Sequence, residues 1–253
     1  MDAAARLVLD AGPDRRLVAR ELLTPAPLGA RLADGAVHLV GTAAGPLGGD
    51  RLHLHVELLP SVRATVRSVA AALAQRGDGT PSHHHVEVVV GAGAHLDWDL
   101  EPLVAAAGCD HHTSAVVHLA ADASVDWRDE LVLGRSGEVP GRCRSSLRIV
   151  RDGEVVVHQE TSTALPGWDG PAVTAGAAVV GHRVVVGRPA PGRRVADDSR
   201  AAWSRLADDV GLAVAVAGDH ASLRRALDDV APPRPTPPRP TPARPASAGR
   251  SGA

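Results

Sequence analysis

The sequence predicts a mainly β fold, a layered and irregular β-helix-like stack of antiparallel sheets with a few short helices near the C-terminus. Three observations predict it. Short Val- and Leu-rich runs alternate with polar residues at the period of two that is typical of strands. Gly, Pro, Asp and Ser interrupt these runs at the regular spacing expected of all-β proteins. A strand-turn-strand pattern also recurs along the chain.

The clearest strands follow one another in the first 160 residues. Alternation predicts strands over 51–58, 85–90 and 145–151. Asp152-Gly153 then predicts a tight hairpin turn into a further strand over 154–158.

The recurring unit is most evident in residues 88–98, which resemble residues 117–127 at a spacing of 29. A fainter copy, residues 58–66, precedes the first by 30. Repeats of fixed length tend to stack so that each covers the apolar face of the next, which favours a pile of strands over a closed barrel. The alternative is three unrelated hairpins that share a type of turn.

Helices are expected only late in the chain. Asp197, Asp198 and Ser199 are typical caps for a helix through Trp203 and Leu206. A strand is expected over 212–216. Asp219 then predicts a second cap, because the apolar residues after it fall on one helical face, namely Leu223, Ala226, Leu227 and Val230.

Composition divides the chain at residue 231. Residues 1–230 are expected to form one β domain. Residues 231–253 contain eight prolines, four arginines and no acid, which predicts a disordered tail. A PxxP ligand for an SH3-like partner is the alternative. The formal net charge of the whole chain is −2. The tail contributes +4 to it, so the body carries −6.

Charge and cysteine content exclude several classes of function. All 27 basic residues are arginine and 29 acids oppose them, which argues against a nucleic-acid partner. No apolar run has the length of a membrane-spanning helix. Two cysteines and a first segment without signal-peptide character predict a cytoplasmic protein.

Histidine is the residue type that most suggests chemistry. We expect His83, His84 and His85 in one loop, and Cys109, His111 and His112 in another, next to neighbouring strand ends. Thiolate and imidazole suit Ni²⁺ or Zn²⁺. The alternative is that both are solvated loop tips. No P-loop, nucleophile elbow, zinc-protease motif or catalytic triad spacing supports an enzyme.

A glycine-rich segment precedes the strand at 51–58. Gly45, Gly48 and Gly49 indicate a structural turn, since glycine permits positive φ and close backbone approach. Asp50 follows them and could cap the turn, pair with Arg51 or coordinate a cation.

Four ordered blocks resemble the urease accessory protein UreD (UreH) family over roughly residues 30–230. They are residues 45–52, residues 64–72, residues 94–98 with Glu101 and Pro102, and residues 134–138 continuing through Gly141 and Leu147 to Asp152-Gly153. The sequence departs from the family at Ser68-Val69-Ala70, where the family has Thr-Thr-Pro.

The resemblance implies a layered, non-enzymatic scaffold in urease maturation. Such a scaffold binds the F accessory protein, which recruits the G GTPase, and docks on the urease apoprotein so that nickel reaches its active site through a polar internal passage. By motif position, Asp50, Ser68, Glu101 and Glu138 are the expected nickel-route or partner residues, with no permanent cofactor and only transient Ni²⁺. Two alternatives are a metal-dependent hydrolase that uses the His and Cys clusters and a structural β-solenoid interaction protein.

Overall fold

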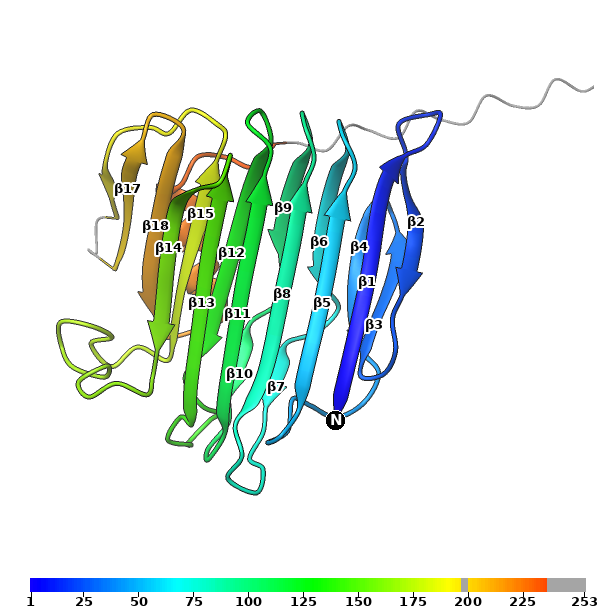
Figure 1. Ribbon diagram of the computed structural model, residues 1–253. Coiled ribbons are helices and arrows are strands. Elements are labelled where there is room, and N and C mark those ends of the chain that lie inside the picture. Colours follow the sequence, from blue (N-terminus) through cyan, green and yellow to red (C-terminus); the bar gives the residue numbers. More distant parts are fainter. Residues whose placement is uncertain (197–199, 236–253) are drawn as a thin grey trace, which may run out of the picture.

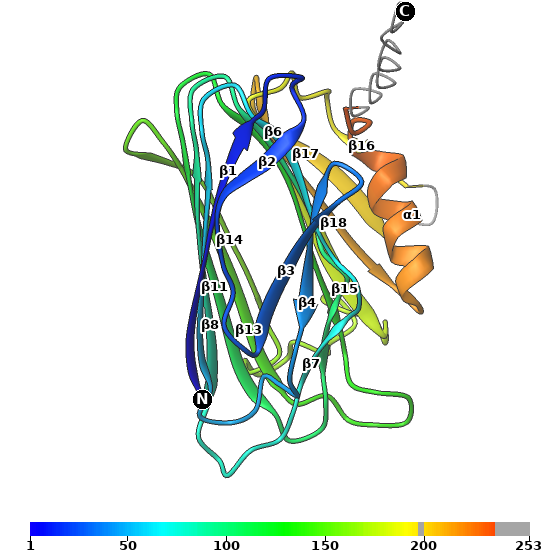
Figure 2. The same cartoon turned by 90° about the vertical axis from the view of Figure 1, so that its right-hand side faces the viewer.

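Two β-sheets packed face to face form the body of the computed structural model, which describes residues 1–196 and 200–235 (Figures 1 and 2). Sheet A contains, in order across it, β14 (Glu154–Ser162), β13 (Arg142–Arg151), β11 (Asp110–Leu119), β8 (Ser82–Val90), β5 (Arg51–Leu58), β1 (Asp2–Ala11) and β2 (Leu17–Leu23). Sheet B contains β16 (Arg194–Val195), β17 (Ala201–Ala207), β18 (Val210–Ala217), β15 (Val179–Val186), β12 (Ser124–Val132), β9 (His95–Asp99), β6 (Arg63–Ser68), β4 (Ala36–Gly41) and β3 (Leu28–Ala33). Two short strands, β7 (Ala72–Ala74) and β10 (Leu103–Ala105), pair with each other, and β10 pairs with β12. The predicted mainly β, stacked architecture is confirmed.

Each predicted repeat is one strand of sheet A, a tight turn and one strand of sheet B. The pairs are β5 with β6, β8 with β9, and β11 with β12, and they lie side by side in chain order (Figure 1). Val88 pairs with Val117, and Trp98 with Trp127. Residues 29 apart in the sequence are therefore direct partners on neighbouring strands. The two indole rings stack with centroids 4.5 Å apart and an interplanar angle of 3°. The three units are therefore stacked repeats and not unrelated hairpins.

The register of the first repeat differs from the expected one. Leu58 pairs with Val90 and Arg63 with His95, a spacing of 32 residues where the sequence comparison gave 30. The expectation is wrong because an alternating pattern looks the same after a shift of two residues, which keeps every side chain on its own face.

The expectation of antiparallel sheets is wrong for the central strands. β1, β5, β8, β11 and β13 are parallel neighbours, as are β4, β6, β9 and β12. The chain crosses to the opposite sheet after each strand and returns, so successive strands of one sheet run in the same direction. Antiparallel pairs lie at the ends of the sheets. The predicted hairpin joins β13 to β14 through Asp152 and Gly153, with φ of 51° and 82°.

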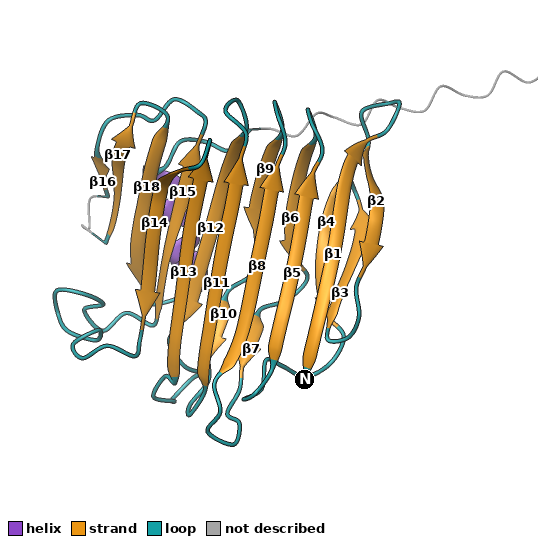
Figure 3. Cartoon of the chain, viewed as in Figure 1, coloured by secondary structure: helices purple, strands orange, loops and turns teal. Residues whose placement is uncertain are grey.

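The described residues contain one helix, α1 (His220–Val230), on the outer side of sheet B (Figures 2 and 3). Asp219 caps it by accepting a hydrogen bond from the Ser222 amide at 2.8 Å, as predicted. Its buried residues are Leu223, Leu227 and Val230.

The helix expected through Trp203 and Leu206 is instead the strand β17, and its predicted caps, 197–199, lie outside the described residues. The indole of Trp203 is fully buried, lies against Gly211 of β18 and donates to the Pro191 carbonyl at 3.0 Å. Pairing with β18 therefore overrides the helical pattern. The strand expected over 212–216 is confirmed as part of β18.

A network of charged residues lies buried between sheet B and α1. Arg183 donates two hydrogen bonds to the Asp126 carboxylate, at 2.8 and 2.7 Å, and the side chains are 1% and 0% exposed. Asp228 of α1 accepts a hydrogen bond from Arg183 at 3.1 Å, and Arg224 of α1 lies 3.1 Å from Glu130. Because each buried charge has an opposite partner, the helix is fixed to the sheet by ion pairs as well as by apolar contact.

Residues 231–235, the start of the proline-rich segment, continue along the same surface. The carbonyl of Pro232 accepts from Arg183 at 3.0 Å and that of Pro233 from Arg188 at 2.6 Å. Arg234 pairs with Asp97 and lies 3.4 Å from Asp99. The tail was predicted to be disordered over residues 231–253; residues 231–235 instead make these contacts with the body, and residues 236–253 lie outside the described residues. No helix among the described residues has the length and apolarity needed to cross a membrane.

Candidate functional site

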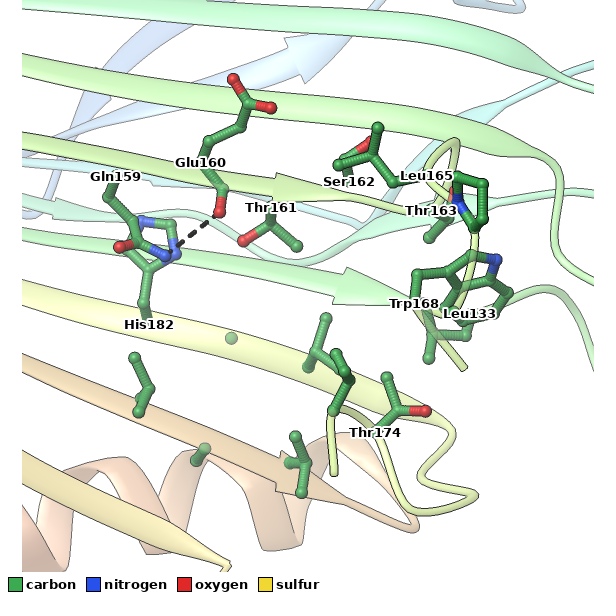
Figure 4. A pocket seen from close by; sticks show the side chains of 18 residues that line it. Leu133, Gln159, Glu160, Thr161, Ser162, Thr163, Leu165, Trp168, Thr174 and His182 are labelled. Carbon is green, nitrogen blue, oxygen red and sulfur yellow. Dashed lines mark hydrogen bonds between the residues drawn. The ribbon is translucent and has the colours of Figure 1, made fainter. Parts of the chain in front are cut away.

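A pocket of 420 Å³ opens at one end of the space between the sheets (Figure 4). It lies between the end of β14 on one side and β15 and β18 on the other, and loop residues 163–178 supply Leu165, Trp168 and Thr174 to its wall. Gln159, Glu160 and His182 lie at the opposite end from Trp168 (Figure 4). Polar side chains line both parts of the pocket, with Ser162, Thr163 and Thr174 near the loop and Gln159 and His182 at the inner end.

The inner end of the pocket adjoins a smaller cavity, and the two share Thr161 and His182. Asp129 of β12 and Ser145 of β13 line the smaller cavity. The Ser145 hydroxyl donates to Asp129 Oδ2 at 2.5 Å, a hydrogen bond that joins the two sheets. A carboxylate, an imidazole and two hydroxyls therefore face one another between the two sheets.

His182 is the most buried titratable group of this inner site, which we define as Asp129, Ser145, Thr161 and His182. The residue is 3% exposed, and its Nε2 atom has no hydrogen-bond partner. Burial lowers the pKa of His182, against the opposing effect of the Asp129 charge. The ring is therefore neutral at physiological pH and keeps a lone pair available as an acceptor or ligand.

Oxygen and neutral imidazole groups such as these can solvate a divalent cation. Within residues 1–196 and 200–235, no three His, Cys, Asp or Glu side chains converge closely enough to hold a metal ion.

Asp50 lies at the start of β5, buried to 4% exposure. Its carboxylate accepts hydrogen bonds from the Met1 amino group at 2.7 Å and the Leu47 amide at 2.8 Å. Burial opposes ionisation, but these bonds outweigh it and lower the pKa of Asp50. Asp50 therefore remains ionised and holds the turn that precedes β5.

The glycines of this turn have backbone requirements that explain them. Gly45 and Gly49 have φ of 155° and 84°. A Cβ on Gly48 would lie 2.7 Å from the Gly77 Cα, so the two backbones pack too closely for any side chain.

Ser68 and Glu101 are brought together at the ends of β6 and β9. The Ser68 hydroxyl accepts a hydrogen bond from the Glu101 amide at 2.9 Å. The Glu101 carboxylate, 37% exposed, lies 3.5 Å from Arg224 of α1. Both residues therefore belong to the edge of the charged network under the helix.

Glu138 lies in the loop between β12 and β13, apart from the other three. It accepts from the Arg135 side chain at 2.8 Å and the Ala107 amide at 3.1 Å. The hydrogen bond from Arg135 is the main reason that the pKa of Glu138 falls to about 2. Glu138 thus contacts its own loop and the loop before β11.

The two histidine clusters occupy strands and not loops, which corrects the expectation. The five histidines lie in β8 and β11, which are direct neighbours, whereas Cys109 lies in the loop directly before β11, as expected. Burial alternates along both: the imidazole of His83 is exposed, whereas that of His111 is 1% exposed and bonded to Ser82 at 2.8 Å.

Successive residues therefore point to opposite faces, and the six predicted ligands separate into two sets. The outward set is His83, His85 and His112; the inward set is His84, His111 and Cys109. Cys109 and Cys143 are free thiols, with Sγ atoms 3.7 Å apart.

Sequence reasoning missed the inner site. Asp129 carried the best signal, since it occupies an inward position of β12 between Trp127 and Leu131, where an apolar residue is expected. No spacing in the sequence links these four residues. Asp129 is the register partner of His182 in sheet B, Ser145 is that of Thr161 in sheet A, and packing of the sheets brings the two pairs together.

Similarity to known proteins places this architecture in a family. The chain matches the UreD urease accessory protein model over residues 2–239. It is 36% identical over 260 residues to the urease accessory protein UreD of Parafrankia sp., covering 90% of this chain and 86% of that protein. The UreD of Streptomyces coelicolor is 42% identical over 204 residues, covering 78% of this chain and 80% of the relative. The UreD of Frankia casuarinae is 40% identical over 169 residues, which span 62% of this chain and 53% of the relative. The chain therefore belongs to the UreD family of urease accessory proteins.

Proposed function

We propose that this chain is an adaptor in urease maturation that links the F and G accessory proteins to the urease apoprotein and helps nickel reach its active site. The observation that carries the proposal is the family match, which extends over residues 2–239 and thus over both sheets and the helix. The role in urease maturation follows from the family, and the finer partners and nickel delivery are the proposed part.

The inner site supports the nickel step. Carboxylate and hydroxyl oxygens with a neutral imidazole hold a borderline cation weakly, as a transit path requires. His182 lines both the 420 Å³ pocket and the adjoining cavity of about 10 Å³, and Asp129 lines the second, so the two provide such groups between the sheets. The proposal assigns the chain no catalytic step of its own, and its two free thiols suit a reducing cytoplasm.

The test is urease activity in nickel-fed cells that express the cognate urease and the other accessory genes, with and without this chain, at equal urease levels. Activity that depends on the chain supports the adaptor. Equal activity without it overturns the proposal.

A pair of variants then tests the inner site. Asp129→Asn preserves size and the contact with Ser145 but removes the charge, and Asp208→Asn removes a fully exposed carboxylate as the control. We expect the first to lower activation several-fold at unchanged soluble protein and unchanged co-purification with partners, and the second to have no effect. Full activation with Asp129→Asn excludes the inner site as the nickel route and leaves the adaptor role standing.

A further inference from the structure

The outer face of sheet A carries an unusual concentration of imidazole side chains. Seven of the 13 histidines of the sequence lie on it, on four strands: His53, His55, His83, His85, His112, His118 and His158. No other element of the described structure covers this face, which is opposite to the one that packs on sheet B (Figure 2).

Strand register places four of these residues in two cross-strand pairs. His83 of β8 is the register partner of His112 of β11, and their ring centroids are 5.1 Å apart. His53 of β5 is the partner of His85, with centroids 5.8 Å apart. The pairs share strand β8, so the four rings form one patch, the imidazole patch.

The spacing of the rings suits a shared metal ion. With metal–nitrogen bonds of about 2.0–2.1 Å, two imidazoles on one ion at tetrahedral or octahedral angles have centroids roughly 4.5–5.5 Å apart. The His83–His112 pair is within that range, and the other pair reaches it by a small side-chain rotation.

Each pair also has an oxygen that orients one ring. His112 Nε2 lies 3.2 Å from Asp110 Oδ1, and His85 Nδ1 lies 2.9 Å from the Ser114 hydroxyl. A ligating histidine characteristically donates its other N–H to such a group, which fixes the tautomer and aims the free nitrogen outward. The free nitrogens here are His112 Nδ1 and His85 Nε2.

We propose that the imidazole patch binds a late-transition divalent cation such as Ni²⁺ or Zn²⁺, with His83 and His112 as the main ligand pair and water in the remaining positions. Imidazole is a preferred ligand of these ions. The site has two protein ligands per ion, consistent with the lack of any three-residue cluster in the described chain, so binding is reversible. It goes beyond the proposed adaptor role, because it requires no partner and lies on the opposite side of sheet A from the inner site.

The chain supplies a matched control. His118 and His158 lie on the same face and are exposed, but their register partners on the neighbouring strands are Val89, Val150 and Arg148, not histidines. The test variant His53→Gln with His83→Gln removes one ring from each pair, and the control His118→Gln with His158→Gln removes two unpaired rings.

The experiment is calorimetric titration of the untagged full-length chain with Ni²⁺ alone. We expect saturable binding by the native chain, a loss of affinity of at least tenfold in the test variant and no change in the control. Equal unfolding midpoints of the three proteins establish that both variants fold. X-ray absorption of the loaded native chain should show two imidazole nitrogens per nickel.

Absence of binding to the native chain, unchanged affinity in the test variant, or an equal loss in the control overturns the proposal. Urease activation of the same variants separates the two proposals. If the test variant loses Ni²⁺ affinity in vitro but still activates urease fully, the adaptor role stands and the patch is a separate site.

Discussion

The outer faces of the two sheets are built from the same repeats but differ in what covers them. On sheet A, the Arg144–Glu160 pair has a 2.8 Å contact, and both side chains are partly in water, at 54% and 33% exposure. On sheet B, the Asp126–Arg183 pair has a similar contact of 2.7 Å at 0% and 1% exposure. The repeat determines which face of a sheet each side chain lies on. Whether that face is covered, as sheet B is by α1 and residues 231–235, determines how much an ion pair contributes to stability.

That difference has an energetic meaning. An exposed ion pair contributes about 0–1 kcal/mol, because water screens both charges. Removal of one partner from a buried pair leaves the other charge without compensation and costs about 3–5 kcal/mol. Similar distances on the two faces should therefore correspond to very different stabilities.

The largest expected effect is that of Asp126→Ala on the covered face. It leaves Arg183 buried without its main partner, and Arg188, 3.3 Å away, loses a contact too. We expect the free energy of unfolding to fall by about 3–5 kcal/mol, measured by urea denaturation. Glu160→Ala on the open face is the control, with an expected loss of at most about 1 kcal/mol. Equal losses would show that the cover does not control the strength of the pairs.

A smaller effect is expected from pH on His95, at the covered edge of β9. Burial, and then the Arg63 charge, lowers the pKa of His95 to about 4. The Asp126 charge raises this pKa, and the charges of Arg188 and Arg234 lower it. An unfolded imidazole has a pKa near 6.5. Between these values the unfolded chain binds a proton that the folded chain does not, so stability falls as pH is lowered from about 6.5 toward 4.

His95→Gln removes this term, which is up to about 3 kcal/mol at the acid end of the window. The measurement is the slope of unfolding free energy against pH for native, His95→Gln and His118→Gln chains. His118→Gln is the open-face control for the loss of an imidazole, since His118 is exposed. A slope unaffected by His95→Gln would contradict the assignment.

The smallest expected effect concerns α1, the helix that covers part of sheet B. Asp219→Ala removes the cap of α1, whose carboxylate accepts from the Ser222 amide and hydroxyl. We expect a loss of about 1 kcal/mol, with faster amide exchange in α1 and unchanged exchange in β8 and β11. Equal acceleration in α1 and in β8 and β11 would show that the helix is part of one cooperative unit with sheet A.

The repeat explains why so much of the fold could be predicted. A spacing of 29 residues with Trp98 and Trp127 at equivalent positions leaves few arrangements other than stacking. Strand direction could not be predicted, because alternation is the same for parallel and antiparallel neighbours. Trp203 shows the opposite limit: its helical pattern is overruled by a neighbouring strand with Gly211 opposite the indole.

The residues of a candidate site could be predicted only where they cluster within one strand. His83 and His112 were both singled out from local clustering, but their adjacency depends on register. His53, in an earlier repeat, joins them only through that register. The inner site was less accessible still, since Asp129 and His182 are distant in sequence and meet only because β12 and β15 are paired in a register that makes them partners.

The order of synthesis gives the ion pairs of sheet B a further consequence. Asp97, Asp99 and Asp126 leave the ribosome well before Arg183 and Arg234, the arginines that neutralise them. Arg128, 3.4 Å from Asp99, is made with the early repeats, so during translation these repeats carry an acidic surface that is only partly compensated. Stacking of the repeats can start on the nascent chain, but closure of this surface has to wait until residue 234 has emerged.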